Sequence, residues 1–597
     1  MNRIKIAALL LCLALLAGCT QTPVSPVTLP APIAMPEDPV FSMLFDLENQ
    51  ISLQLDMCDE ELAKMQQDYE QYDQQGSKSP IYRKGDLHIT IQTPQGEQHT
   101  YFIEEVGVRM KGNTSRTDFY NPAEGIYNII HLKLSFQETF DDPDYYGSDA
   151  KQWEDSARKA RKDRTFATLE KLDLRWNRCD DGSYLKEYFA YETYRQYGVP
   201  APHTNLVSFQ WAGIHMGVFT INEPVDKLFL SKYFPEEAQG GDLYKCGWAG
   251  NQNASFMNTA SIGIEDEDKG LFFAYDLKTN KKISTHEALR NLIHQLNAST
   301  QTKDSFAQLV NIETFLPYCA VSYLLGNPDD MRNNYNNFYV YFRADNNQVV
   351  VIPYDFDRCL GVTTHWNPTG DAVTSDNPFG KTLLATGQTQ GNPLIRYSVM
   401  AGGFYVQEYA NILQQITDGT WFTEENFADL YQIAEENYAH LAQPEQTFRN
   451  TEGLHLAFDL KRTSSFSSNG NISFAEYLDA KTKTLNRYLA KTNRYANQSV
   501  EQITDWYIRA DFTDWQVKDG SEMVSDDGKW IYHLETDREV RLKLYQQSAD
   551  RWYGTECVAQ DCSVSYRTDE HTNIVLPRGN YRITIDPDTL TIYLETE

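Results

Sequence analysis

The segment from Leu325 to Gly361 constrains the fold most strongly, because it predicts two neighbouring strands joined by a short turn. Phe338–Arg343 is predicted as the first strand and Ala344–Gln348 as a polar turn. Val349–Pro353 is an apolar run and is predicted as the second strand. Strands connected in this way pair with each other, so residues just before the first strand and just after the second lie at one end of the hairpin.

Acidic and amide side chains are predicted to occupy that end of the hairpin. Two acidic pairs and two asparagines flank the strands, namely Asp329, Asp330, Asn336, Asn337, Asp355 and Asp357. Their oxygen atoms are hard ligands that suit Mg²⁺ or Mn²⁺, and Mg²⁺ usually keeps part of its coordination for water and substrate phosphates. The same residues also fit a simple turn, a strand-end cap or a structural Ca²⁺ site.

The length and net charge of the chain limit the classes of protein to which it can belong. A chain of 597 residues is too long for one ordinary hydrophobic core, so we expect two or more domains. The formal net charge of −30 disfavours nucleic acid as a partner, because phosphate backbones bind basic surfaces. The same charge would repel a membrane surface, so membrane attachment would need an anchor.

The N-terminus has the pattern of such an anchor. Arg3 and Lys5 precede the apolar run Ile6–Leu16, which is too short to span a bilayer and reads as the core of a signal peptide over residues 1–18. Leu16-Ala17-Gly18-Cys19 resembles a bacterial lipobox, which makes Cys19 the expected lipidated first residue of the mature chain. We therefore expect a lipid-anchored protein of the bacterial cell envelope, on the periplasmic or outer surface.

A proline-rich segment follows Cys19, and residues 19–40 are predicted to form a tether. Six prolines lie between Thr20 and Pro39, which favours an extended chain. Removing Cys12 and Cys19 from the nine cysteines leaves seven, an odd number, so at least one is unpaired outside the cytoplasm. Cys557 and Cys562 are close enough in sequence to close a small loop and form the one pair that we predict.

The rest of the chain predicts an α+β body over residues 41–498 and an all-β sandwich over 499–597. Strand patterns dominate the first part of the body, and helical patterns dominate after Gly361. Residues 141–164 are charged and lack an apolar period, so we expect a mobile insertion there. From about Asp505 six short aromatic strands alternate with Gly and Asp turns, which is typical of a sandwich.

The body contains, in order, a polar glycine turn, a strand lysine, a helix glutamate, a hairpin and the acidic cluster. Phosphoryl transfer needs backbone amides over phosphate, a lysine held by a glutamate, a metal carboxylate and a carboxylate for the acceptor. Several stretches resemble the spore coat protein H (CotH) family of secreted atypical kinases over roughly Phe45–Leu489: VRMKGNTSR, HLKLSF, DGSYLKEYFAYETYRQYGVPAPHTNLVSF, GVFTINEPVD, LYK, NNFYVYF and VIPYDFDRCLG.

This resemblance implies a bilobal, protein-kinase-like body that transfers the γ-phosphoryl group of ATP to Ser or Thr of an extracytoplasmic protein with Mg²⁺ or Mn²⁺. In the N-terminal half it implies a nucleotide site. Gly112, Asn113, Ser115 and Arg116 would cover the phosphates and Lys133 would contact them. Glu187 would hold Lys133 from its helix, and Glu223 would lie near the hinge that receives the adenine.

The resemblance also implies roles for the acidic cluster. Asp330 or Asp329 would orient the acceptor hydroxyl, Asn336 or Asn337 would help to bind the metal, and Asp355 or Asp357 would be the main Mg²⁺ ligand. Shorter members of the family place the catalytic Asp about five residues before the metal Asn, as kinases do, whereas Asp330 precedes Asn336 by six residues and Asn337 by seven. Both members of each pair therefore remain candidates.

The C-terminal segment resembles a different kind of module from the body. Residues 506–515, 527–530 and 580–586 resemble the small sandwich modules of pullulanases and starch-binding lipoproteins. Trp506, Trp515 and Trp530 could stack on sugar rings if exposed, or form the core if buried. The alternative function is therefore a catalytically inert surface protein, in which the body is a scaffold and the sandwich binds a glycan or a partner.

Overall fold

The computed structural model describes residues 29–113, 115–121, 125–126, 128–298, 301–364, 372–380, 392–464, 471–498, 506–518, 520–526, 529–546, 551–555, 562–565, 572–587 and 589–597. The predicted signal peptide, Cys19 and Cys557 lie outside these residues, and so does the side chain of Cys562. The predictions of lipidation and of a Cys557–Cys562 bond are therefore not addressed by the fold.

A closed seven-stranded barrel forms the first part of the body, with strand order β1-β2-β3-β6-β7-β9-β8. Its strands are β1 (Gln50–Asp56), β2 (Arg83–Gln92), β3 (Gln98–Lys111), β6 (His131–Ser135), β7 (Lys171–Trp176), β8 (Thr204–Trp211) and β9 (Ile214–Asn222). Neighbouring strands are antiparallel except β1 and β8, whose parallel pairing closes the barrel. Alternate residues such as Leu87, Ile89 and Ile91 are fully buried, which explains the strand pattern.

Two helices flank the barrel near its start, α2 (Pro39–Phe45) and α3 (Asp59–Asp73). The Asp38 side chain accepts a hydrogen bond from the backbone N–H of Phe41 and begins α2. Upstream of α2, the Ile33 N–H donates to the Arg195 carbonyl at 2.9 Å, and Leu29 packs against the core. The end of the predicted tether thus packs against the body and does not extend away from it.

Residues 141–164 are regular in structure, which corrects the expectation of a mobile insertion. They form α4 (Pro143–Tyr146), a short 3₁₀ turn and α5 (Asp155–Lys162). The Arg164 guanidinium donates to the Glu104 and Glu105 carbonyls at 2.6 and 3.1 Å, and the Trp153 indole donates to the Thr139 carbonyl at 2.8 Å. Contacts to the barrel, not an internal apolar period, hold this segment, so its own sequence carried no sign of them.

A second sheet of five strands follows the barrel, with order β11-β12-β10-β13-β14. The strands are β10 (Leu243–Cys246), β11 (Ile262–Gly263), β12 (Tyr275–Leu277), β13 (Phe338–Phe342) and β14 (Val349–Pro353). β13 and β14 pair antiparallel from Phe338–Pro353 to Phe342–Val349, which confirms the predicted hairpin. The single helix α6 (Lys186–Gln196) lies in sequence between barrel strands β7 and β8.

Helices make up most of the remaining body. They are α7 (Lys227–Tyr233), α8 (Glu287–Asn297), α9 (Lys303–Leu309), α10 (Ile312–Leu325), α11 (Met331–Asn334), α12 (Pro393–Ser398), α13 (Val406–Asp418), α14 (Glu424–Tyr438), α15 (Phe474–Leu489) and α16 (Thr492–Ala496). α10 is buried along most of its length and packs against α13. Among the described residues, no helix is long and apolar enough to cross a membrane.

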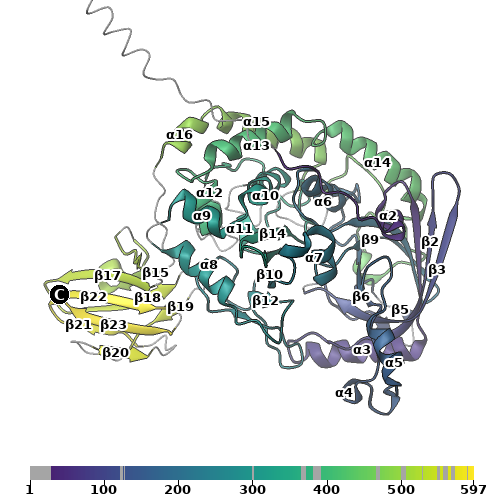
Figure 1. Ribbon diagram of the computed structural model, residues 1–597, viewed down its shortest axis with the longest axis horizontal. Helices are drawn as coiled ribbons and strands as arrows, with labels where there is room; N and C mark the ends of the chain where they lie inside the picture. Colours follow the sequence, from purple (N-terminus) through teal and green to yellow (C-terminus); the bar gives the residue numbers. More distant parts are fainter. Residues whose placement is uncertain are drawn as a thin grey trace, which may run out of the picture.

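The C-terminal strands form two sheets around a shared core, at the opposite end of the molecule from the barrel (Figure 1). One contains β15 (Trp506–Ala510), β18 (Val540–Gln546), β19 (Arg551–Tyr553) and β21 (Ile574–Leu576). The other contains β16 (Val524–Asp526), β17 (Lys529–Thr536), β20 (Cys562–Ser565), β22 (Gly579–Asp586) and β23 (Thr591–Thr596). All six predicted strands are present, and helices and sheets together make the chain α+β.

Candidate functional site

The predicted site residues gather where one end of the barrel meets the five-stranded sheet. Strands β3, β6 and β7 contribute charged side chains from the barrel, and the segment after β14 contributes Tyr354, Asp355 and Asp357. β14 is buried on every residue, so burial fixes the position of the acidic segment that follows it. Asp355 has φ +60°, a left-handed conformation that turns the chain sharply at the strand end.

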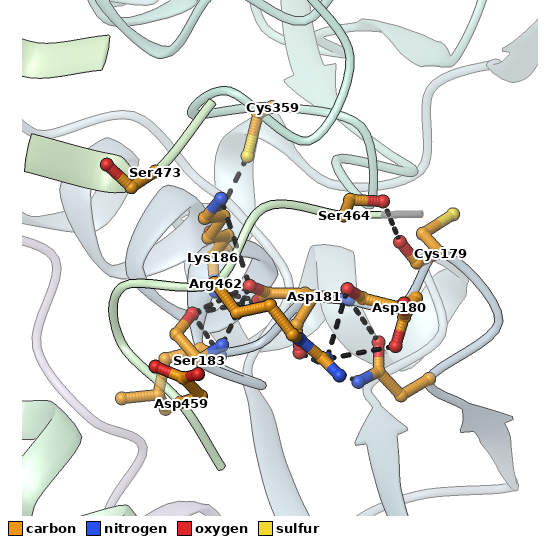
Figure 2. A network of polar contacts seen from close by, with 12 residues as sticks. Cys179, Asp180, Asp181, Ser183, Lys186, Cys359, Asp459, Arg462, Ser464 and Ser473 are labelled. Carbon is orange, nitrogen blue, oxygen red and sulfur yellow. Dashed lines mark hydrogen bonds and ion pairs between the residues drawn. The ribbon is translucent and has the colours of Figure 1, made fainter. Parts of the chain in front are cut away.

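A polar turn positions α6 and its Glu187 at this junction. The Asp181 carboxylate accepts hydrogen bonds from the backbone N–H groups of Ser183 and Lys186, each at 3.0 Å (Figure 2). Arg462 donates to Asp180 at 2.9 Å, and Ser464 donates to the Cys179 carbonyl at 2.6 Å. Asp181 therefore accepts the first backbone N–H of α6 from the preceding turn, and a distant segment of the chain holds that turn in place.

Arg175 on β7 connects three carboxylates in the site. Its Nη1 donates to Glu187 at 2.7 Å, and its Nη2 lies 2.6 Å from Asp355 and 2.8 Å from Asp357. The Arg175 side chain is buried, so these contacts are shielded from water. The partner of Glu187 is thus Arg175 and not Lys133, which corrects the predicted Lys133–Glu187 pair.

Burial and shared charge shift the pKa values of these groups. Burial raises the pKa of Glu187 to about 7, although Arg175 opposes the rise. Burial and the nearby Asp355 also raise the pKa of Asp357. The pKa of Asp355 is lowered, because Arg175, Lys111 and Lys245 together outweigh the effect of burial. Asp355 is therefore the acidic residue of this group that most strongly favours the charged form required of a metal ligand.

Lys133 pairs with a second buried carboxylate, Asp173. The Asp173 carboxylate on β7 lies 2.5 Å from the ammonium of Lys111 on β3 and 3.6 Å from that of Lys133 on β6. Burial alone would raise the pKa of Asp173, but the two lysines hold it below its usual range. One carboxylate thus balances two ammonium groups, and one positive charge remains.

The predicted phosphate-covering turn begins where β3 ends. Gly112 has φ +117°, and an added Cβ would lie only 1.9 Å from the Ser115 hydroxyl, so glycine is required there. Asn113 is exposed. Arg116 donates to the Ser77 carbonyl at 2.8 Å, so its guanidinium is already engaged by the protein.

Glu223 follows β9 and lies in an internal network. Its carboxylate pairs with Lys232 at 2.7 Å and accepts hydrogen bonds from the Tyr233 hydroxyl at 3.0 Å and the His203 N–H at 3.1 Å. The side chain has no exposed surface. The structure therefore places the Glu223 carboxylate in the protein interior, where protein groups and not a nucleotide occupy it.

The two aspartates before the hairpin, Asp329 and Asp330, differ in their burial and in their hydrogen bonds. Asp330 is fully buried, caps α11 through the Asn333 N–H at 2.8 Å and accepts from the Ser322 hydroxyl at 2.5 Å. Asp329 is half-buried, and its carboxylate accepts hydrogen bonds from side-chain amides of Asn334, Asn336 and Asn337 at 2.6, 3.0 and 3.1 Å. Asp330 is thus the helix cap, and Asp329 is the candidate that can face an acceptor.

Asn327 joins the two acidic segments. Its Oδ1 accepts the Asp329 N–H at 3.0 Å, and its Nδ2 donates to the Asp355 carbonyl at 3.1 Å. The side chain is fully buried. The predicted convergence of the two acidic pairs at one end of the hairpin is therefore confirmed for Asp329 and Asp355.

A family comparison agrees with this geometry. The model of the family described as CotH kinase protein matches residues 148–509, which is more than half of the chain. The chain belongs to the CotH kinase protein family. No curated protein matches it. The match begins after Lys133, so it covers Arg175, Glu187 and the acidic cluster but not the lysines of β3 and β6.

Membership of a CotH kinase family indicates a kinase-like phosphotransferase. In that context the structure adds residues that sequence reasoning missed. One of them is Asn334, which lies five residues after Asp329. The catalytic Asp and the metal Asn of the kinase catalytic loop have the same spacing, so Asn334 could have been found from the sequence. Arg175, Asp173 and Lys111 had no comparable signal, because only the barrel places them beside the predicted residues.

The donor set fits a divalent cation that is shared with phosphate oxygens. Among the described residues, no group of three or more His, Cys, Asp and Glu is placed to hold a metal by itself. Ca²⁺ takes six to eight oxygen ligands, whereas Mg²⁺ in nucleotide sites is held by one or two carboxylates plus phosphates and water. The side chains of Asp355 and Asp357 are 32% and 28% exposed, so both keep access to a ligand.

Proposed function

We propose that this CotH family member is an atypical protein kinase that transfers the γ-phosphoryl group of ATP to Ser or Thr of an extracytoplasmic protein. The observation that carries the proposal is the amide-bound Asp329 joined through Asn327 to the Asp355 backbone. This link brings an acceptor-orienting carboxylate and a metal-type carboxylate into one rigid unit, as phosphoryl transfer requires.

The charges on the two sides of Asp355 support the same function. Three carboxylates, those of Glu187, Asp355 and Asp357, contact the guanidinium of Arg175, and this arrangement favours a divalent cation beside them. Among the described residues, Lys111 and Lys133 share Asp173 as their one ion-pair partner, and this arrangement favours phosphate beside them. A metal–nucleotide complex carries the complementary pattern of charge.

In the proposed reaction Asp329 orients the acceptor hydroxyl and receives its proton. The hydroxyl oxygen bonds to the γ-phosphorus while the bond from that phosphorus to the β–γ bridging oxygen breaks, which yields a phosphoester and ADP. Lys111 and Lys133 bind phosphate oxygens. Asp355, with Asp357 and the amide oxygens of the Asn336–Asn337 segment, would hold Mg²⁺ or Mn²⁺, which neutralises phosphate charge when bound.

Between the two asparagines, the surroundings favour Asn337 as the amide ligand. A Cβ added to Gly247 would lie 2.6 Å from Oδ1 of Asn336, so that oxygen lies beside Gly247. Asn337 has φ +57° and donates through Nδ2 to Asp329, which leaves its own Oδ1 for a ligand.

The proposed setting is the bacterial cell envelope, with the chain anchored through a lipid on Cys19. The support for this proposal is the sequence pattern of residues 1–19 alone. The protein-kinase-like bilobal arrangement is part of the same proposal, with the barrel as the nucleotide-binding half and the helical region as the acceptor-binding half.

The test is phosphoryl transfer from γ-labelled ATP to a serine-rich acceptor protein with Mg²⁺ or Mn²⁺. We expect Asp329→Asn and Asp355→Asn to abolish transfer. Asp345→Asn is the matched control, because Asp345 is an exposed aspartate in the turn of the same hairpin. Absence of nucleotide binding by the folded wild-type protein would end the proposal.

The alternative, a non-catalytic binding protein, now rests on a different part of the C-terminal module. Trp506 and Trp530 are buried in its core, so they cannot stack on a sugar. A pocket of about 640 Å³ instead lies beside the exposed Phe512, with Tyr532 and Arg578 in its lining. Glycan binding that Phe512→Ala removes, by a full-length chain that is inert to nucleotide, would favour this alternative.

A further inference from the structure

Lys245 lies on β10 of the five-stranded sheet and faces the barrel residues of the site. Its Nζ is 4.5 Å from the centre of the Tyr354 ring, and the Nζ of Lys111 is 5.6 Å from the same centre. Tyr354 directly precedes Asp355. Lys245 therefore approaches the acidic segment from the sheet, while Lys111 approaches it from the barrel.

The ammonium of Lys245 is half-buried and has no carboxylate within ion-pair distance among the described residues. Its neighbours differ in this respect. Lys111 and Lys133 pair with Asp173, and Lys278 pairs with Glu265 and Asp276. A sheltered ammonium without an anionic partner is costly, and a bound anion is the usual compensation.

The environment of Lys245 keeps it charged. Burial alone would lower its pKa, but Tyr354 and Tyr339 raise it above the ordinary value. Tyr339 is also the cross-strand partner of Lys245 on β13. The face of the Tyr354 ring thus holds the cation in place. Its N–H groups have no acceptor among the described residues, so they can donate to a ligand.

We propose that Lys245 is a phosphate-binding residue, which completes with Lys111 and Lys133 a three-lysine site for the triphosphate of a nucleotide. The inference rests on the proposed kinase function and extends it to a residue of the second sheet. Among the described residues, Asp173 is the one carboxylate in ion-pair contact with these three ammonium groups, and the position of Lys245 next to Tyr354 assigns it to the phosphate nearest Asp355. The bound triphosphate would then join the barrel to the sheet, because each contributes a lysine.

The test compares Lys245→Met with wild type, because methionine keeps an unbranched side chain without the charge. Lys282→Met is the matched control, since Lys282 is an exposed lysine that carries the same charge. The ligands are ATP, inorganic triphosphate and adenosine, and binding is measured by calorimetry on the full chain. We expect Lys245→Met to weaken binding of ATP and triphosphate at least tenfold and to leave adenosine binding unchanged.

Equal triphosphate affinity in wild type and Lys245→Met would overturn the inference. If Lys245→Met does not fold, Lys245→Gln replaces it with the same expected losses. Binding of inorganic triphosphate distinguishes a failure of the Lys245 inference from a failure of the proposed kinase function. Loss of triphosphate binding in Lys245→Met supports the lysine site even if ATP transfer is absent, whereas transfer with unaltered triphosphate affinity supports the kinase and rejects the role of Lys245. A merely structural role would shift the melting temperature and adenosine binding together.

Discussion

The guanidinium of Arg175 lies 2.6 Å from the carboxylate of Asp355, although 180 residues separate them in the chain. The same guanidinium contacts Glu187 and Asp357. A barrel strand, a helix and the segment after the central hairpin are therefore held together by one buried cation. This arrangement makes the acidic segment dependent on a residue that belongs to none of the predicted motifs.

Arg175→Gln should destabilise the protein and make it more dependent on divalent cations. Removing one partner of a buried ion pair costs about 3–5 kcal/mol, and the partial exposure of Asp355 and Asp357 should reduce this to roughly 2 kcal/mol. Bound Mg²⁺ or Mn²⁺ would then neutralise the negative charge of the carboxylates that have lost Arg175. We expect the metal-induced rise in melting temperature to be larger in Arg175→Gln than in wild type.

Arg343→Gln serves as the control for that experiment, because Arg343 pairs with the exposed Asp345 outside the site. Surface pairs of this kind contribute about 0–1 kcal/mol. Equal metal-induced shifts in all three proteins would contradict a role for Arg175 in balancing the acidic cluster.

Asp329→Asn and Asp330→Asn should have opposite consequences for phosphoryl transfer. Loss of the acceptor-orienting carboxylate in Asp329→Asn should reduce kcat by about a hundredfold or more. Asp330→Asn should retain activity within a few-fold, since asparagine also caps helices and the site is otherwise intact. Steady-state kinetics on both variants, with circular dichroism to establish folding, measures this difference. An inactive but folded Asp330→Asn would return the catalytic role to Asp330.

Transfer activity should fall in acid with a midpoint near the pKa of Asp329. Burial raises that pKa to about 6, against the opposing hydrogen bonds from Asn334 and Asn336. The carboxylate must be ionised to accept the hydroxyl proton, so kcat/KM should decrease about tenfold per pH unit below about pH 6. A rate profile that is flat from pH 7 to pH 5 would exclude Asp329 as the proton acceptor.

Glu187→Gln should change the pH dependence of stability in a defined direction. The folded-state pKa of Glu187 is raised to about 7, above the ordinary value of 4.5, because the carboxyl is buried. Its favourable contribution is therefore fully present below about pH 4.5 and is lost as pH rises through about 7. Relative to Glu187→Gln, the wild type should lose free energy of unfolding between pH 5 and pH 8, as measured by urea titration at each pH.

Local patterns predicted much of the architecture. The apolar run of β14, the alternation in the barrel strands and the Gly and Asp turns near the C-terminus each reflect short-range rules of strand formation. The segment 141–164 was misjudged, since its order comes from arginine contacts to distant carbonyls.

The sequence predicted some members of the candidate site but not their pairings. Asp329, Asp355, Glu187 and Lys133 were all singled out, and the structure brings them to one junction. Their partners depend on which side chains of neighbouring strands face the same way, and Arg175 and Asp173 lie on β7, which pairs with β6 and β9. Glu223 was predicted to lie near the adenine of a nucleotide, because the sequence around Glu223 does not show that its side chain is buried.

The sequence by itself determined that this chain carries a strand hairpin flanked by oxygen ligands, a C-terminal set of short strands and the motifs of the CotH kinase family. These features depend on residues close together in the chain. Tertiary structure decided that Asp330 is buried as a cap while Asp329 is not, and that Glu187 pairs with Arg175 while Lys133 pairs with Asp173. The physical reason is that burial and ion pairing depend on distances between segments far apart in sequence, which no local pattern specifies.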